Sequence, residues 1–136
     1  MTARRCGQLP VAGEDDIIVV RRAVRTLAEA HGFDTFASAA LVTATSELTR
    51  NAWSHAGGGI ALIDVVEEGD RVGVRVTLKD SGPGIADPTA ALAGGFSTAK
   101  SLGLGLSGSR RLVDEFNLQS IVGQGTTVEI LKWKTI

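Results

Sequence analysis

The sequence predicts one α/β domain, and three observations carry that prediction. Two long segments repeat apolar residues at helical spacing, and a later segment alternates apolar and polar residues as a strand does. The length of 136 residues, with 43% hydrophobic and 21% charged residues, is typical of one globular domain. A single domain with a sizeable core is therefore expected over residues 1–136.

Two helices are expected in the first half of the chain. The first covers about residues 14–31 and ends at Gly32. Its apolar residues recur at helical spacing: Ile17, Val20, Val24 and Leu27. The second covers about residues 34–55, and the glycines at 57–59 end it. One side of this second helix carries four small or apolar residues: Leu41, Ala44, Leu48 and Ala52.

A hairpin follows, with strands at about residues 60–66 and 71–80 and a turn at 67–70. In its second strand the apolar residues occupy one face: Val72, Val74, Val76 and Leu78. Asp80 continues the parity of these residues, so its side chain is expected to point inward. Residues before Leu9 form either an edge strand or a disordered segment.

The rest of the chain predicts a loop, a third helix and two strands. Glycines and prolines concentrate in residues 81–105, which we interpret as a mobile loop. A helix is expected at about 104–116, and strands at about 118–122 and 126–133.

Composition excludes several classes of function. Fourteen Lys and Arg against fifteen Asp and Glu give a net charge of −1, and aromatic residues make up 4%, so nucleic-acid binding is not expected. No apolar run approaches the roughly 18 residues of a membrane span. Cys6 is the only cysteine, which excludes an internal disulfide and indicates a reducing, cytoplasmic environment.

Glu47 and Asn51 lie four residues apart on the second expected helix, so both point to the same side. A carboxylate in this position can accept a proton from a hydroxyl group, and an amide oxygen is a ligand that Mg²⁺ accepts. The same spacing is also typical of a solvated polar stripe.

Asp80 is more informative because an unpaired carboxylate at the end of an apolar face would be costly. A hydrogen-bond donor is therefore expected beside it. Gly82 and Gly84 let the backbone approach a neighbour closely, and an inward carboxylate beside bare backbone suits an adenine amino group. An ordinary turn after a strand is the alternative.

Residues 102–109 form a glycine-rich run at the start of a helix, where free backbone N–H groups and the helix dipole can bind phosphates. The run matches the dinucleotide fingerprint formally, but no strand is expected before it. Residues 94–101 lack one glycine of the phosphate-binding loop of P-loop nucleoside triphosphatases, so that loop is not expected. Residues 105–109 lack the second glycine of an esterase nucleophile elbow, so esterase chemistry is not indicated.

Taken in order, four motifs resemble those of the GHKL ATPases, which include gyrase, histidine kinases and the MutL repair proteins. The motifs are Glu47-Leu-Thr-Arg-Asn51, Asp80-Ser-Gly-Pro-Gly84, Gly103-Leu-Gly105-Leu and Gly123-Gln-Gly125-Thr126-Thr127. Within that superfamily, residues 46–51, 95–98 and 110–116 most resemble the anti-sigma-type serine/threonine kinases, and among these the stressosome switch kinases. The resemblance extends from about Asp15 to Trp133.

The resemblance implies a two-layer α/β sandwich, the Bergerat fold, with a mixed and mainly antiparallel sheet, helices on one face, and ATP held under a lid. It implies that Glu47 is the general base, that Asn51 holds Mg²⁺ and that Asp80 accepts a hydrogen bond from adenine. It assigns further residues to nucleotide binding: Gly82, Gly84, Ile85, Ser97, Thr98, Lys100, Gly103, Leu104, Gly105 and Thr126. Lys100 departs from the small residues that related sequences often carry, and it either reaches a terminal phosphate or is solvated.

The function implied is phosphorylation of Ser or Thr on a STAS-domain protein by Mg-ATP, followed by activation of a PP2C-type phosphatase through binding. One alternative is an anti-sigma factor that sequesters a sigma factor directly, and another is a catalytically weak nucleotide-binding adapter. A histidine-kinase catalytic fragment is disfavoured because no helix with a phosphoacceptor histidine is expected before the domain.

Overall fold

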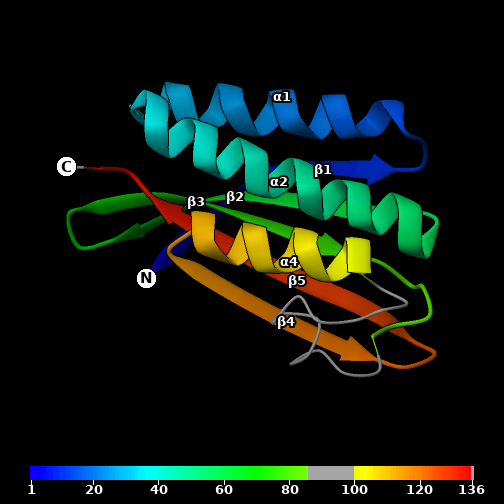
Figure 1. Cartoon of the computed structure of the whole chain (residues 1–136). Coiled ribbons are helices and arrows are strands. Elements are labelled where there is room, and N and C mark those ends of the chain that lie inside the picture. The colour runs from blue at the N-terminus through cyan, green and yellow to red at the C-terminus, as the bar shows by residue number, and fades with distance from the viewer. Residues whose placement is uncertain (86–99, 136) are drawn as a thin grey trace.

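The computed structural model describes residues 1–85 and 100–135 as a two-layer α/β sandwich. A five-stranded sheet forms one layer, and helices α1, α2 and α4 lie together on one of its faces (Figure 1). The helices are α1 (Asp15–Ala30), α2 (Thr35–Ala56) and α4 (Lys100–Leu112). The strands are β1 (Thr2–Val11), β2 (Gly59–Glu68), β3 (Arg71–Lys79), β4 (Glu115–Ile121) and β5 (Gly125–Trp133). The sandwich implied by the sequence is confirmed.

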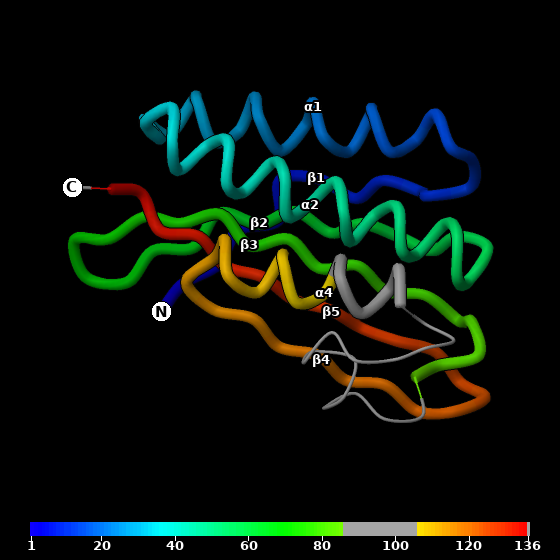
Figure 2. The backbone as a smooth tube through the Cα atoms, viewed as in Figure 1, coloured from blue at the N-terminus to red at the C-terminus, as the bar shows by residue number. Residues whose placement is uncertain are grey.

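The strands follow the order β1-β2-β3-β5-β4, and all four pairings are antiparallel. The sheet described here is therefore antiparallel throughout rather than mixed. Strand β1 is an edge strand paired with β2, so the edge-strand alternative for the N-terminal residues is confirmed. The first strand, β1, runs beneath the helices in the view of Figure 2. The last strand, β5, occupies an inner position of the sheet, between β3 and β4.

Both long helices have the ends and buried faces that the sequence predicts. Asp34 precedes α2, and its Oδ1 accepts a hydrogen bond from the backbone N–H of Ala37 at 2.7 Å, which satisfies one free donor of the first turn. Gly57 ends α2 with φ of +76°. The small and apolar side of α2 is buried over its whole length: Leu41, Ala44, Leu48 and Ala52.

The core lies between these helices and the inner face of the sheet. It contains fully buried branched residues from both layers: Val20, Val24, Leu41, Leu48, Ile63, Val74, Val76, Leu106 and Ile130. Burial of such side chains stabilises each by roughly 1.5–3 kcal/mol relative to exposure to water. The alternation predicted for residues 71–80 is confirmed for Val74, Val76 and Leu78, which all belong to the core, whereas Val72 is only half-buried.

The predicted third helix at 104–116 is wrong at both ends, because α4 covers Lys100–Leu112. Its glycines lower intrinsic helix propensity, which moved the predicted start too far along the chain. Contacts between α2 and α4, with Leu106 fully buried, override that propensity. The helix ends before Asp114, whose backbone N–H donates to Leu131 and whose carboxylate accepts the N–H of Trp133. These bonds start β4 at Glu115, three residues before the predicted position.

The face of the sheet opposite the helices carries an ion cluster that is centred on the buried Asp64 and spans three strands. Asp64 on β2 pairs directly with Arg5 on β1 and Arg75 on β3. Its carboxylate accepts from Arg5 Nε at 2.5 Å and from Arg75 Nη2 at 3.2 Å, and the Asp64 side chain is 4% exposed. Because a buried carboxylate needs such partners, the cluster ties the edge strand to the centre of the sheet.

Replacing Asp64 by Ala is expected to lower the free energy of unfolding by about 2–3 kcal/mol, because Arg75 would keep a largely buried, unpaired charge. Arg5 is half-exposed and can return to water, which limits the loss. Urea denaturation measures it. The matched control is Glu68→Ala, which removes an exposed ion pair with Arg71 and should cost less than about 1 kcal/mol. Equal losses in the two variants would contradict a stabilising role for the cluster.

No helix within residues 1–85 or 100–135 is long and apolar enough to cross a membrane.

Candidate functional site

A cavity of about 190 Å³ lies between α2, α4 and the β3–β5 side of the sheet. It contains five residues assigned to nucleotide or metal binding from the sequence: Asn51, Asp80, Gly84, Ile85 and Thr126. Its walls are mostly apolar: Leu48, Ala52, Leu78, Leu106 and Val128. Apolar walls with a few converging polar groups are typical of ligand sites. Since pockets for drug-sized ligands measure about 300–1,000 Å³, this cavity suits part of a nucleotide, such as its base.

Asp80 follows β3 immediately and is fixed by two hydrogen bonds to the backbone. Its Oδ1 accepts from the N–H of Gly82 at 2.9 Å and from the N–H of Thr126 at 3.2 Å. The donor partners expected for an inward carboxylate are thus present. Both bonds go to Oδ1, and Oδ2 has no hydrogen-bond partner among the described residues. Asp80 therefore offers the cavity an oriented acceptor.

The glycines around Asp80 are required by contacts within the protein. A Cβ at Gly82 would lie 2.5 Å from Cβ of Ala56, and one at Gly84 would lie 2.5 Å from the carbonyl oxygen of Ile121. The close approach expected from the sequence is therefore explained by packing of the segment after β3 against α2 and β4. Gly84 also lines the cavity, whereas Gly82 does not and contributes to the site through its N–H, which donates to Asp80 Oδ1.

Gly125 offers the sharpest test of this packing. Its φ is +130°, and a Cβ there would lie 2.1 Å from the carbonyl oxygen of Asp80. Gly125→Ala is expected to cost more than about 3 kcal/mol of unfolding free energy, because clash and strain add. Gly123 is the matched control: its φ is +82° but nothing lies within 4 Å, so Ala there should cost about 1–2 kcal/mol. Equal losses in urea denaturation would contradict the close approach.

Asn51 lies on α2 with its side-chain amide at the cavity. Its Nδ2 is buried and has no hydrogen-bond partner among the described residues, so this donor is left for a ligand or water to satisfy. Among residues 1–85 and 100–135, no three His, Cys, Asp or Glu side chains gather into a metal site. Asn51 fits Mg²⁺ in another way, since this ion is usually held by one or two protein oxygens together with substrate phosphates and water.

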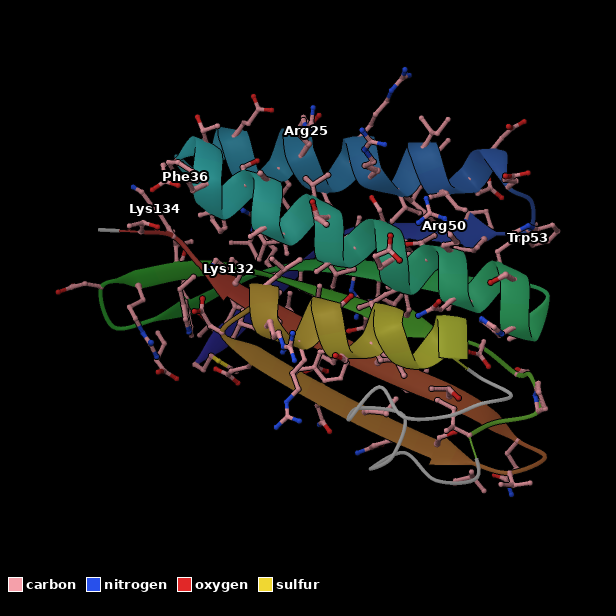
Figure 3. All side chains as sticks on the ribbon, in the orientation of Figure 1. Arg25, Phe36, Arg50, Trp53, Lys132 and Lys134 are labelled. Carbon is pink, nitrogen blue, oxygen red and sulfur yellow. The ribbon has the colours of Figure 1, made fainter. Side chains whose placement is uncertain are left out.

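Glu47 lies one turn before Asn51 but is not among the residues that line the cavity. Its Oε1 accepts a hydrogen bond from Arg50 Nη1 at 2.7 Å, and its side chain is 40% exposed. Figure 3 shows Arg50 projecting from the C-terminal half of α2, as Trp53 does. This ion pair was not predicted from the sequence, although a spacing of three residues is a recognised signal for ion pairs on helices.

The glycine-rich run, expected at the start of a helix, lies wholly within α4. Gly103, Leu104 and Gly105 fall in the first two turns of the helix, which begins at Lys100. The first turn of a helix has N–H groups without intrahelical acceptors, so its end nearest Lys100 is the part suited to phosphate. Ser97, Thr98 and the expected lid lie outside the described residues.

Two further residues at the site were not assigned from the sequence. His55 lines the cavity one turn after Asn51, in the last turn of α2. Ser120 on β4 accepts the N–H of Ile85 at 2.7 Å and lies 2.9 Å from the hydroxyl of Thr126. The signal for Ser120 was present, because Phe116, Leu118 and Ser120 share the inward-facing parity of β4.

Residues 11–132 match the histidine kinase-like ATPase domain family, and the chain belongs to it. The chain is 42% identical over 120 residues to serine/threonine-protein kinase RsbT of Bacillus subtilis (strain 168), a match that covers 88% of this chain and 90% of that protein. It is also 35% identical over 100 residues to the anti-sigma F factor of Anoxybacillus flavithermus, covering 68% of this chain and 67% of that protein.

Two solved structures share the fold. The RsbU and RsbW domains of Rv1364c from Mycobacterium tuberculosis superimpose with a TM-score of 0.64 at 20% identity, over all of this chain and 34% of that one. The SiaB–SiaC complex from Pseudomonas aeruginosa gives a TM-score of 0.56 at 15% identity, over 96% of this chain and 91% of that one.

Proposed function

We propose that the chain is a single-domain serine/threonine protein kinase that transfers a phosphoryl group from Mg-ATP to a Ser or Thr of a partner protein. The observation that carries the proposal is the cavity shared by Asn51, Asp80 and Thr126. Membership of an ATPase family and 42% identity to a protein named as a kinase support it.

Asp80 would recognise the base. Its Oδ2 would accept a hydrogen bond from the adenine amino group, while Oδ1 stays bound to Gly82 and Thr126. Leu78 and Val128 would pack against the base, since both are apolar and line the cavity. The cavity volume is consistent with a site for the base alone, because the triphosphate would extend beyond the cavity toward the start of α4.

Asn51 would hold Mg²⁺, which when bound neutralises charge on the phosphates. The first two turns of α4, with Lys100 to Gly105, would bind phosphate, and the donors would be the free backbone N–H groups of the first turn together with the helix dipole. Ser97 and Thr98 are proposed to join this set. Phosphoryl transfer depends mainly on such positioning and charge stabilisation.

Glu47 would act as the general base. Its carboxylate would accept the proton of the incoming serine or threonine hydroxyl as that oxygen attacks the terminal phosphorus of ATP, whose bond to the bridging oxygen breaks to release ADP. The side chain is 40% exposed, so a hydroxyl on another protein can reach it. Arg50 would pair with the carboxylate until the substrate arrives. The pair would then open easily, since an exposed ion pair of this kind is worth less than about 1 kcal/mol.

The partner we propose is a STAS-domain protein in a bacterial partner-switching pathway in the cytoplasm, and release from it would leave the kinase free to bind and activate a PP2C-type phosphatase. The identity to RsbT and to an anti-sigma factor supports a switch of this kind.

The proposal is tested by incubating the full chain with radiolabelled ATP, Mg²⁺ and a STAS-domain protein encoded near its gene, and then mapping the labelled residue. Label on one Ser or Thr of the STAS protein is expected. Binding of ATP without transfer to any such protein would instead support the nucleotide-binding adapter.

A second candidate is an anti-sigma factor, favoured by the 35% identity to anti-sigma F factor. A pull-down with the purified chain separates the two. Retention of a sigma factor with no label on a STAS protein would replace the kinase proposal.

A further inference from the structure

We propose that Ser120 is a positioning residue that makes the base end of the cavity selective for adenine over guanine. The inference rests on the proposed nucleotide-binding function. It assigns a role to a residue that touches neither the nucleotide nor the reacting atoms, and that acts through Thr126 and Ile85.

The hydroxyl of Ser120 joins three separate parts of the site. Its Oγ accepts the backbone N–H of Ile85 at 2.7 Å, which links β4 to the segment after β3. The same Oγ lies 2.9 Å from the hydroxyl of Thr126 and 3.3 Å from the carbonyl oxygen of Gly125, both on β5. Ile85 and Thr126 both line the cavity, whereas Ser120 does not.

A serine hydroxyl has one proton, so Ser120 can donate to Thr126 or to Gly125 but not fully to both. The contact to Thr126 is the shorter by 0.4 Å, from 3.3 Å to 2.9 Å, and lies at the usual length for two hydroxyl groups. When the Ser120 hydroxyl donates to Thr126 Oγ1, the hydroxyl proton of Thr126 is not engaged in a hydrogen bond to Ser120. Thr126 can then donate into the cavity.

The cavity would therefore present a donor from Thr126 beside an acceptor from Asp80. The two residues are held together, since the N–H of Asp80 donates to the carbonyl of Thr126 at 2.9 Å and Asp80 Oδ1 accepts the N–H of Thr126 at 3.2 Å. Adenine presents an amino group at position 6 and an acceptor nitrogen at position 1, which match this pair. Guanine presents an oxygen and an N–H at the same positions, so both contacts would be repulsive.

Without the Ser120 hydroxyl, Thr126 would be free to present either its proton or its lone pairs. Ile85 would also lose its partner, leaving a backbone N–H to be satisfied by water. Ser120→Ala is therefore expected to lower ATP affinity about tenfold and to lower GTP affinity less. The ratio of ATP to GTP affinity would fall several-fold. A role limited to packing would lower both affinities equally.

The experiment measures binding of ATP and of GTP, each with Mg²⁺, to the wild-type chain and to Ser120→Ala, Ser120→Thr and Ser120→Cys by calorimetry. Thr keeps the hydroxyl and is expected to keep the wild-type ratio, while Cys keeps the size with a weak donor and is expected to behave like Ala. Thr127→Ala is the matched control, because Thr127 is next to Thr126 but points to the opposite face of β5.

Amide hydrogen exchange provides a second readout that needs no nucleotide. Exchange at Ile85 should be faster in Ser120→Ala and Ser120→Cys than in the wild-type chain, and unchanged in Thr127→Ala. A wild-type ATP-to-GTP ratio in both Ser120→Ala and Ser120→Cys would overturn the inference, as would loss of the ratio in Ser120→Thr. If the wild-type chain bound neither nucleotide, the proposed function would fail at that step, before any variant is compared.

Discussion

Replacing Glu47 by Gln is expected to lower phosphoryl transfer to the protein substrate by roughly 10²–10⁴-fold, the usual contribution of a general base. The amide keeps the size and polarity of the side chain but cannot accept a proton. Because Glu47 is outside the set of cavity-lining residues, the affinity for Mg-ATP should change less than about twofold. Single-turnover transfer and calorimetry measure the two quantities separately.

The matched control is Glu68→Gln. Glu68 forms an ion pair with Arg71 at 2.6 Å, with the same spacing of three residues and similar exposure as the pair of Glu47 with Arg50. Both substitutions therefore remove an equivalent surface interaction, and only the first should slow transfer. Full activity of the Glu47 variant would withdraw the assignment of the base.

Asp80→Asn is expected to weaken ATP binding by about two orders of magnitude. The amide oxygen can still accept from Gly82 and Thr126, so the segment after β3 keeps its conformation. The amide nitrogen would then replace Oδ2 and point a donor at the amino group of adenine. Two donors facing each other lose the hydrogen bond and leave both groups unsatisfied.

Calorimetry with Mg-ATP measures this loss, and the unfolding free energy serves as the internal control because it should change by less than about 1 kcal/mol. Asp80→Ala separates the two functions of the carboxylate, since it also removes the bonds to Gly82 and Thr126 and should destabilise the fold. Wild-type affinity in Asp80→Asn would show that the carboxylate does not contact the base.

Much of the fold could be predicted because the signals were local. The helical repeat of Ile17, Val20 and Val24, and the alternation of Val74 and Val76, each follow from burial on one face. The start of α4 could not be predicted in this way. Its glycines argue against a helix locally, and packing against α2, which is distant along the chain, favours the helix that forms.

The site was predictable where a single residue had to satisfy a physical requirement. An inward carboxylate at Asp80 demands donors, and two backbone N–H groups supply them. Ser120 was missed because one of its partners, Ile85, is 35 positions away, and because its contact with Thr126 forms only when β4 pairs with β5. The sequence predicted a close backbone approach at Gly82 and Gly84 but not what approaches them, since their neighbours Ala56 and Ile121 are distant along the chain.

The most direct test of a nucleotide site between α2, α4 and the sheet is a crystal structure of the full chain with Mg²⁺ and a non-hydrolysable ATP analogue. We expect the adenine amino group within hydrogen-bond distance of Asp80 Oδ2, and the metal on the side-chain oxygen of Asn51. An analogue bound elsewhere, with this cavity filled only by water, would contradict the account.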